Sequence, residues 1–208
     1  MVKIKICGIT NMADALAAVS MGADATGFIF ADSPRRADPA IVRQVVAATK
    51  GKVLTVGVFV NERLARVKEI VKQCSLDAVQ LHGEEEPSYC NRLNGIPIIK
   101  AFRIKDGKSL ETIPSYENIF AYLLDTYSDK VYGGTGTTFD WSLAIKAKSF
   151  GKPIILSGGL GANNIEEAIR VVRPYGVDIS SSIESRPGLK DHRRMREVIN
   201  LIRRMKRA

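Results

Sequence analysis

The sequence is poor in the residues from which metal sites and disulfide frameworks are built. Its 208 residues include three cysteines (Cys7, Cys74 and Cys90) and two histidines (His82 and His192). The cysteines form no CxxC pair, an odd number of them cannot all pair with one another, and the histidines lie far apart in the chain. The composition therefore argues against a structural zinc site and a disulfide scaffold, and we expect neither a metal nor a cofactor.

Long apolar runs are also missing. No stretch approaches the ~20 apolar residues that a helix needs to cross a bilayer. The first residues, MVKIKICGIT, alternate between apolar and polar types, which is unlike the apolar centre of a secretory signal. We therefore expect a cytoplasmic protein without a membrane partner. Its length and its 45% apolar residues predict a single domain over residues 1–208.

The charge is unevenly distributed. The chain carries a formal net charge of +9, of which residues 190–208 supply +6 through eight Lys and Arg against two acids. Within this segment Met195, Val198, Ile199, Ile202 and Met205 recur at helical spacing. We expect a terminal helix that docks through this stripe, with a basic outer face. No aromatic residues are interleaved to stack on bases, so we expect no nucleic acid partner, and RNA binding is the non-enzymatic alternative.

The chain alternates short β-rich runs with helical patterns, without an intervening linker. Several of the runs are almost wholly apolar, as strands covered on both faces must be. The predicted strands are 2–7, 25–30, 53–60, 77–81, 96–102, 119–125, 152–158 and 177–180. The helical patterns between them include 11–22, 61–74 and 163–174, with a fifth helix expected within 106–116.

Eight successive strand-then-helix units predict a closed (β/α)8 TIM barrel. A doubly wound open sheet is the alternative, but the turn after the first strand reads CGIT and lacks the GxGxxG of dinucleotide-binding folds. Because such barrels typically run to ~250 residues, this one must be compact with short loops. Its chemistry is then expected at the carboxyl ends of the strands.

Two of these strand ends carry residues suited to proton transfer. Cys7 closes the first strand, where a thiolate in positive surroundings could act as base or nucleophile; otherwise it is a small buried apolar residue. Asp125 closes the apolar run FAYLLD, and a carboxyl group leaving an apolar wall can serve as an acid. The alternatives for Asp125 are a helix cap or a structural ion pair.

The ends of the last two strands predict a phosphate site. Gly158 and Gly159 follow the seventh strand, and Ser180 and Ser181 follow the eighth. Glycines allow backbone N–H groups to approach an anion and serines add hydroxyl donors, although either loop alone could be an ordinary tight turn. The stretch GGTGTT (133–138) lacks the lysine of a nucleotide-binding loop, and we interpret it as a mobile lid.

Arg35 and Arg36 follow the second strand in the sequence SPRR. A guanidinium group at the barrel mouth could bind a carboxylate through two hydrogen bonds, or it could be a solvated surface charge. Together the strand ends indicate proton transfer on a small phosphorylated substrate. Without a metal or nucleotide motif, isomerisation is the natural reaction class.

The motifs KICGIT, AVQLHGEE, LLDT, GGTGTTFDW, LSGGL, VDISSSIE and PGLKD, in this order, closely resemble the phosphoribosylanthranilate isomerase family of tryptophan biosynthesis. The resemblance extends over essentially the whole chain and includes no fused synthase domain. It implies an Amadori rearrangement of N-(5′-phosphoribosyl)anthranilate to 1-(2-carboxyphenylamino)-1-deoxyribulose 5-phosphate, with no cofactor or metal. It leaves open whether the protein is a monomer or a homodimer.

The resemblance also implies roles for particular residues. Asp125 would be the general acid and Cys7 the general base. Arg35 would hold the anthranilate carboxylate, and the phosphate would be held by Gly158, Gly159, Ser180 and Ser181.

The sequence departs from the family at two places. Arg36 follows the SPR motif, so either arginine could reach the carboxylate. Ser182 replaces a usual glycine, and it either distorts the phosphate turn or adds a donor if its φ is negative.

Two other interpretations of the enzymatic function remain open. Indoleglycerol-phosphate synthase is the rival phosphate-binding barrel, and it would need a catalytic lysine such as Lys100. Side activity on the related histidine-pathway intermediate would call for an aspartate where Cys7 stands.

Overall fold

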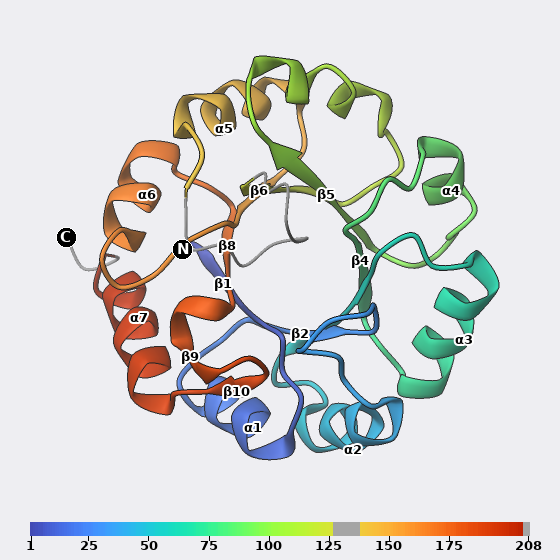
Figure 1. Ribbon diagram of the computed structural model, residues 1–208, viewed down its shortest axis with the longest axis vertical. Coiled ribbons are helices and arrows are strands. Elements are labelled where there is room, and N and C mark those ends of the chain that lie inside the picture. Colours follow the sequence, from blue (N-terminus) through green and yellow to red (C-terminus); the bar gives the residue numbers. More distant parts are fainter. Residues whose placement is uncertain (127–137, 206–208) are drawn as a thin grey trace.

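The strands close into one parallel barrel surrounded by helices (Figure 1), in a computed structural model that describes residues 1–126 and 138–205. Each strand pairs with the next in parallel, and the pairing of the first with the eighth completes the ring. The strands are β1 (Lys3–Cys7), β2 (Ala25–Ile29), β3 (Leu54–Phe59), β4 (Ala78–Leu81), β5 (Ile98–Ile104), β6 (Ala121–Thr126), β7 (Ile154–Leu156) and β8 (Gly176–Ile179). The predicted (β/α)8 barrel is confirmed, and the open doubly wound sheet is wrong.

The outer layer consists of α-helices, most of which begin at a polar residue that caps them. The Asn11 side chain, for example, accepts the backbone N–H of Asp14 at the start of the first helix. The helices are α1 (Met12–Ser20), α2 (Pro39–Thr49), α3 (Leu64–Cys74), α4 (Pro87–Asn91), α5 (Trp141–Ala147), α6 (Ile165–Val172) and α7 (His192–Arg204).

The helix expected within 106–116 is wrong as an α-helix. Two 3₁₀ helices, Gly107–Leu110 and Ile113–Ser115, occupy this segment. Pro114 lies in the second of them and has no N–H to extend an α-helical ladder. The Asp106 side chain accepts from the backbone at the start of the first, which favours a short capped turn.

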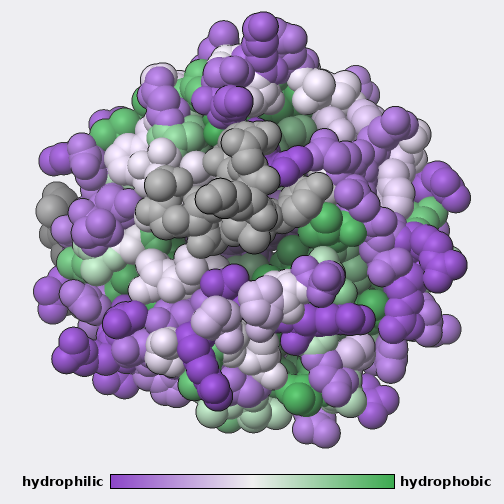
Figure 2. All heavy atoms as spheres, viewed as in Figure 1, coloured by the Kyte–Doolittle hydropathy of each residue, from purple (hydrophilic) through white to green (hydrophobic). Residues whose placement is uncertain are grey.

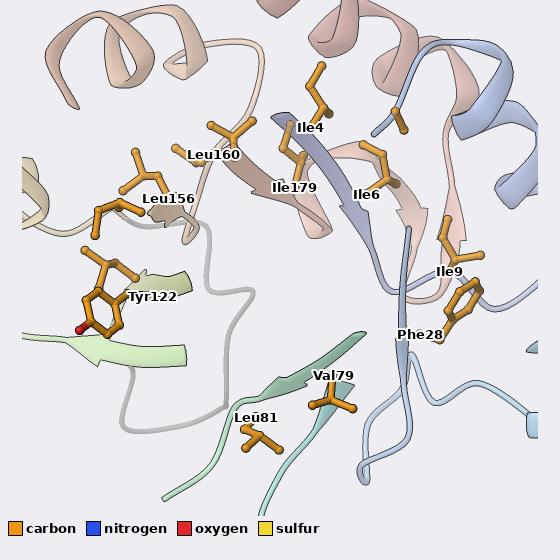
Figure 3. Close-up of a cluster of buried hydrophobic side chains, with 14 of the residues drawn as sticks. Ile4, Ile6, Ile9, Phe28, Val79, Leu81, Tyr122, Leu156, Leu160 and Ile179 are labelled. Carbon is orange, nitrogen blue, oxygen red and sulfur yellow. The ribbon is translucent and has the colours of Figure 1, made fainter. Parts of the chain in front are cut away.

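The alternation of side chains along each strand separates two apolar layers. The larger layer lies between strands and helices, and Figure 3 shows Ile4, Ile6 and Phe28 pointing from their strands toward it. The smaller layer fills the barrel interior and consists of Val56, Ile99, Ala101, Ala121, Leu123 and Ile155. Because the period is two residues, Asp125 lies on the same interior face as Leu123.

The barrel interior contains charged side chains as well as apolar ones. Lys5 of β1 and Asp178 of β8 are register partners across the strand pair that closes the ring. Their side chains form a buried ion pair, with Nζ 2.9 Å from Oδ1. Two residues further along the same faces lie Cys7 and Ser180, so this pair lies directly beneath two of the predicted site residues.

A second buried ion pair anchors the loop after β4. Lys100 lies between Ile99 and Ala101 of the interior cluster, so its side chain points outward from the barrel. Its Nζ lies 3.2 Å from Glu85 and 2.7 Å from the Gly83 carbonyl oxygen, and it also meets the Leu81 and Ala101 carbonyls. This ammonium group therefore fixes the backbone on either side of His82.

The chain ends in a small hairpin and the terminal helix. The hairpin pairs β9 (Glu184–Arg186) with β10 (Leu189–Lys190) and lies beside α1 and α7 (Figure 1). Helix α7 buries Met195, Val198, Ile199 and Ile202 of the predicted stripe, which confirms that this basic helix docks on the body. Among the described residues, no helix combines the length and the apolar character needed to cross a membrane.

Replacing Lys100 with Met should cost about 3–5 kcal/mol of unfolding free energy, because Glu85 would keep a buried charge without its partner. Denaturant unfolding measures this loss, with Lys68→Met, an exposed lysine on α3, as the matched control. The double variant Lys100→Met/Glu85→Gln should lose less than the single one. A Lys100→Met protein as stable as the control would contradict the prediction.

Candidate active site

Cys7 lies at the carboxyl end of β1, on the same face as Lys5, and is 6% exposed. The neighbouring position on β2 is Gly27, and a Cβ there would lie 2.8 Å from the Cys7 sulfur and 3.0 Å from the Lys5 side chain. Such distances are too short for a side chain. Gly27 therefore leaves the space that the thiol and the lysine occupy.

The electrostatic surroundings of Cys7 differ from the expectation that they favour a thiolate. Burial, together with the negative charge of Asp178, raises the pKa of the Cys7 thiol above its ordinary value. Lys5 and Lys190 act in the opposite direction without cancelling this effect. Burial is the largest of these effects, so the surroundings of Cys7 favour the neutral thiol over the thiolate.

Asp125 lies at the end of β6 and is 2% exposed. Its Oδ1 accepts the backbone N–H of Thr126 at 2.9 Å, and its Oδ2 lies 3.2 Å from His82 Nε2. These two contacts fix the plane of the carboxyl group at the barrel mouth. Both residues lie at the carboxyl ends of parallel strands, so the carboxyl and the thiol are at the same mouth of the barrel, with β7 and β8 between their strands.

His82 and Gln80 were not identified as functional residues by sequence reasoning. The Nε2 of Gln80 donates to His82 Nδ1 at 2.8 Å, which leaves the ring hydrogen on Nε2, the atom facing Asp125. Sequence offered one signal, the position of His82 just past the fourth strand. The hydrogen bond of His82 with Asp125, 43 positions further along the chain, could not be predicted from the sequence.

The two phosphate-loop candidates lie side by side at the same end of the barrel. Gly158 and Gly159 have φ values of +83° and +63°, which few other residues adopt. A Cβ at Gly158 would collide with Thr126 and come within 2.9 Å of Asp125 Oδ1. Gly158 therefore also makes room for the carboxyl group, a requirement that its predicted phosphate role did not include.

The loop after β8 begins with Ser180 and Ser181. Ser182, the departure from the family pattern, does not have a positive φ, and its hydroxyl donates to the Leu160 carbonyl at 2.5 Å. It therefore joins the loops after β7 and β8. The condition that φ is not positive is therefore met, and the donor that Ser182 adds is engaged by the backbone of the neighbouring loop.

Arg35 and Arg36 have different surroundings. Arg35 is partly buried, and its Nε and Nη2 contact the Glu184 carboxylate at 2.8–3.0 Å. Its Cδ lies 3.0 Å from the position of a Cβ built on Gly8, the residue after Cys7. Arg36 is exposed. Arg35 is therefore the arginine that lies next to the candidate base.

Cavities are present at both ends of the barrel among the described residues. One of about 360 Å³ at the carboxyl end is lined by His82, Arg103, Lys105 and neighbouring residues. A larger one, of about 770 Å³, is lined by the amino-terminal parts of the strands, and neither cavity is lined by Cys7 or Asp125. We assign the chemistry to the carboxyl end, where the proton-transfer groups lie. In the view of Figure 2, hydrophilic side chains predominate along the outer edge of this face of the molecule.

Within the described parts of the chain, no three His, Cys, Asp or Glu side chains group as metal ligands. The predicted lid (133–138) lies outside the described residues except for Thr138. The closed barrel, with a thiol and a carboxyl group at the carboxyl ends of its strands, has the architecture of the (β/α)8-barrel class of enzymes.

Comparison with known proteins narrows this class. The model of the N-(5′-phosphoribosyl)anthranilate isomerase family matches residues 4–201. The isomerase of this name from Geobacter sulfurreducens is 50% identical over 200 residues, which cover 96% of this chain and 97% of that protein. The crystal structure of the Thermotoga maritima enzyme superposes with a TM-score of 0.92 at 40% identity, covering 98% and 99% of the two chains.

The chain belongs to the N-(5′-phosphoribosyl)anthranilate isomerase family and is an aldose–ketose isomerase of tryptophan biosynthesis. A related isomerase structure contains reduced 1-(o-carboxyphenylamino)-1-deoxyribulose 5-phosphate; it superposes with a TM-score of 0.88 at 39% identity, covering 98% and 99% of the chains. The resemblance inferred from sequence motifs is confirmed.

Alkylation of Cys7 by iodoacetamide should be slow at pH 7 and should accelerate with pH beyond 9.0, the ordinary thiol value, because burial raises its pKa. Mass spectrometry of the modified Cys7 peptide measures the rate. The Cys7→Ser protein supplies the background from Cys74 and Cys90, which are buried in helices. A rate that levels off below pH 9.0 would show that Lys5 and Lys190 dominate.

Proposed function

We propose that Asp125 and Cys7 are the general acid and the general base of the Amadori rearrangement that this family catalyses. The single observation that carries the proposal is their common position: both are buried, both end a strand, and both face the barrel mouth. Acid–base catalysis needs the donor and the acceptor within reach of neighbouring substrate atoms. Residues 1–208 would act as one catalytic barrel.

The proton movements balance in this assignment. Protonated Asp125 gives its proton to the furanose ring oxygen, the C1′–O bond breaks, and the substrate opens to a protonated Schiff base. The Cys7 thiolate then removes the C2′ proton, the C1′–C2′ double bond forms, and the electron pair of the C=N bond moves to nitrogen to give an enolamine. Tautomerisation moves a proton from the enol oxygen to C1′ and yields the ketone, and proton exchange with solvent returns Cys7 to the thiolate and Asp125 to the acid.

His82 supports this role of Asp125. After Asp125 has released its proton, the carboxylate accepts hydrogen bonds from His82 Nε2 and the Thr126 backbone N–H. Both donors are in place before the charge forms, so they stabilise it without reorganisation. The raised pKa of Cys7 has two opposite effects on its role as the base. Fewer molecules carry the thiolate, but each thiolate is a stronger base.

In this proposal Arg35 binds the anthranilate carboxylate. Two of its guanidinium nitrogens face Glu184, and within the described residues Nη1 makes no hydrogen bond, so Nη1 can donate to a ligand carboxylate. Gly158, Gly159, Ser180 and Ser181 bind the phosphate through backbone N–H groups and hydroxyls. The positive φ values of the two glycines support this part of the assignment.

The synthase alternative is not favoured by any contact. Lys100, the lysine that it would need, points away from the barrel interior and is paired with Glu85. The proposal includes a cytoplasmic enzyme, supported by three free cysteines, which are typical of a reducing compartment. A relative from Thermotoga maritima is described as dimeric, and either a monomer or a homodimer is compatible with our proposal.

Cys7→Ser and Asp125→Asn should each lower kcat by about 10²–10⁴, the usual contribution of a positioned acid or base. The assay follows the loss of anthranilate-type fluorescence after mixing the protein with freshly generated phosphoribosylanthranilate. Cys90→Ser, a buried cysteine away from the mouth, is the control and should retain activity. Full turnover by Cys7→Ser would remove the thiol from the mechanism.

Arg35→Ala should raise KM at least about tenfold with a smaller effect on kcat, because it removes a charged hydrogen bond to bound substrate. Arg36→Ala is the matched control, since Arg36 is exposed and adjacent. Steady-state kinetics with both variants decides between the arginines. A larger rise in KM for Arg36→Ala would reverse the assignment.

A further inference from the structure

The β9–β10 hairpin carries a buried charge cluster that the mechanism above does not use. Glu184 lies at its start, and both carboxylate oxygens are within 3.0 Å of the Arg35 guanidinium group. The same carboxylate accepts from Lys190 Nζ at 2.9 Å and from the Gly188 backbone N–H at 3.3 Å. One acidic side chain thus holds an arginine from the loop after β2 and a lysine from β10.

Lys190 extends this cluster to the phosphate loop. Its Nζ donates to the carbonyl oxygen of Ser180 at 3.2 Å, and its side chain is fully buried. Its backbone N–H donates to the buried carboxylate of Asp14 on α1. A buried lysine of this kind is fixed by its partners, so Ser180 is held at a set distance from Glu184.

The cluster meets the candidate base at Gly8. A Cβ built on Gly8 would lie 3.0 Å from Arg35 Cδ, 3.2 Å from Ser180 Oγ and 3.5 Å from Lys190 Nζ. Gly8 has a φ of +75° and directly follows Cys7. The carboxylate-binding arginine, the phosphate loop and the catalytic strand therefore converge on one position without a side chain.

The charges of the cluster do not cancel. Arg35 and Lys190 contribute two positive charges and Glu184 contributes one negative charge, because their hydrogen bonds hold the pKa of Glu184 below its ordinary value despite its burial. Burial in turn lowers the pKa of Lys190, and Glu184 opposes this effect. These three side chains together carry one net positive charge, and Arg35 and Lys190 both lie next to Gly8 at the carboxyl end of β1.

We propose that Glu184 and Lys190 are positioning residues that set the distance and angle between the carboxylate-binding and phosphate-binding groups. Glu184 aligns the Arg35 fork, and Lys190 ties this alignment to the Ser180 backbone. The inference rests on the proposed function, because it requires Arg35 and the Ser180 loop to bind the two ends of the substrate. Neither Glu184 nor Lys190 needs to contact the reacting atoms.

The test uses two probes that each resemble one end of the substrate: anthranilate and inorganic phosphate as competitive inhibitors. Glu184→Gln should raise KM and the anthranilate inhibition constant by about tenfold or more, with kcat and the phosphate constant changed by about twofold or less. A glutamine side chain has a single, uncharged acceptor oxygen, so it cannot replace the two charged oxygens with which the Glu184 carboxylate accepts hydrogen bonds from Arg35. Lys190→Met should weaken both probes, because it also releases the Ser180 carbonyl.

Arg186→Ala is the matched control, an exposed residue on the same hairpin, and should leave all four constants unchanged. The double variant Arg35→Ala/Glu184→Gln should bind anthranilate no more weakly than Arg35→Ala alone, since Glu184 acts through Arg35. Thermal unfolding shows which variants are folded. If Glu184→Gln does not fold, the inhibition constants of anthranilate and inorganic phosphate for Lys190→Met provide the test.

The two possible failures are distinguishable. If Arg35→Ala leaves anthranilate inhibition unchanged, the proposed function of Arg35 is wrong. If Arg35→Ala weakens it but folded Glu184→Gln behaves like Arg186→Ala, the positioning role is wrong while the proposed function stands. A loss of kcat with unchanged KM in Glu184→Gln would also overturn the inference.

Discussion

The closure of the barrel between β1 and β8 is the constraint on which the site depends. Lys5 and Asp178 are register partners across this pair of strands and form an ion pair 2.9 Å long in the barrel interior. Such a buried pair is costly to break, so it resists any slip of one strand against the other. Because side chains alternate, the same register brings Cys7 and the residue after β8, Ser180, to the mouth.

Much of the fold could be predicted from the sequence because its signals are local. Almost wholly apolar runs mark strands that are covered on both faces, and eight of them in alternation with helical patterns leave few topologies. The stripe on α7 was predictable for the same reason, since helical periodicity can be read within four turns. Two 3₁₀ helices around Pro114 replaced a predicted α-helix, because proline removes the donor on which the longer helix depends.

The site was only partly predictable, because its contacts are between residues far apart in the chain. Cys7 and Asp125 could be selected from their place at strand ends, but the raised pKa of the thiol follows from burial and from Asp178, 171 positions away. The contact of His82 with Asp125 has the same origin. The β9–β10 hairpin has strands of three and two residues, too short for a periodic signal. Lys100 was identifiable as a lysine in a strand, but its outward direction depends on register.

The cavity of about 360 Å³ next to His82 has a consequence for how this barrel can evolve. Its wall comes from β5 and from the segments after β4 and β5, whereas the hairpin and the loops after β7 and β8 join one another by their own hydrogen bonds. Mutations at Arg103 or Lys105 therefore change one side of the mouth and leave the Glu184 cluster intact. Selection for a different substrate can act on that wall first, and a gene duplicate could acquire new specificity there before it loses the ancestral activity.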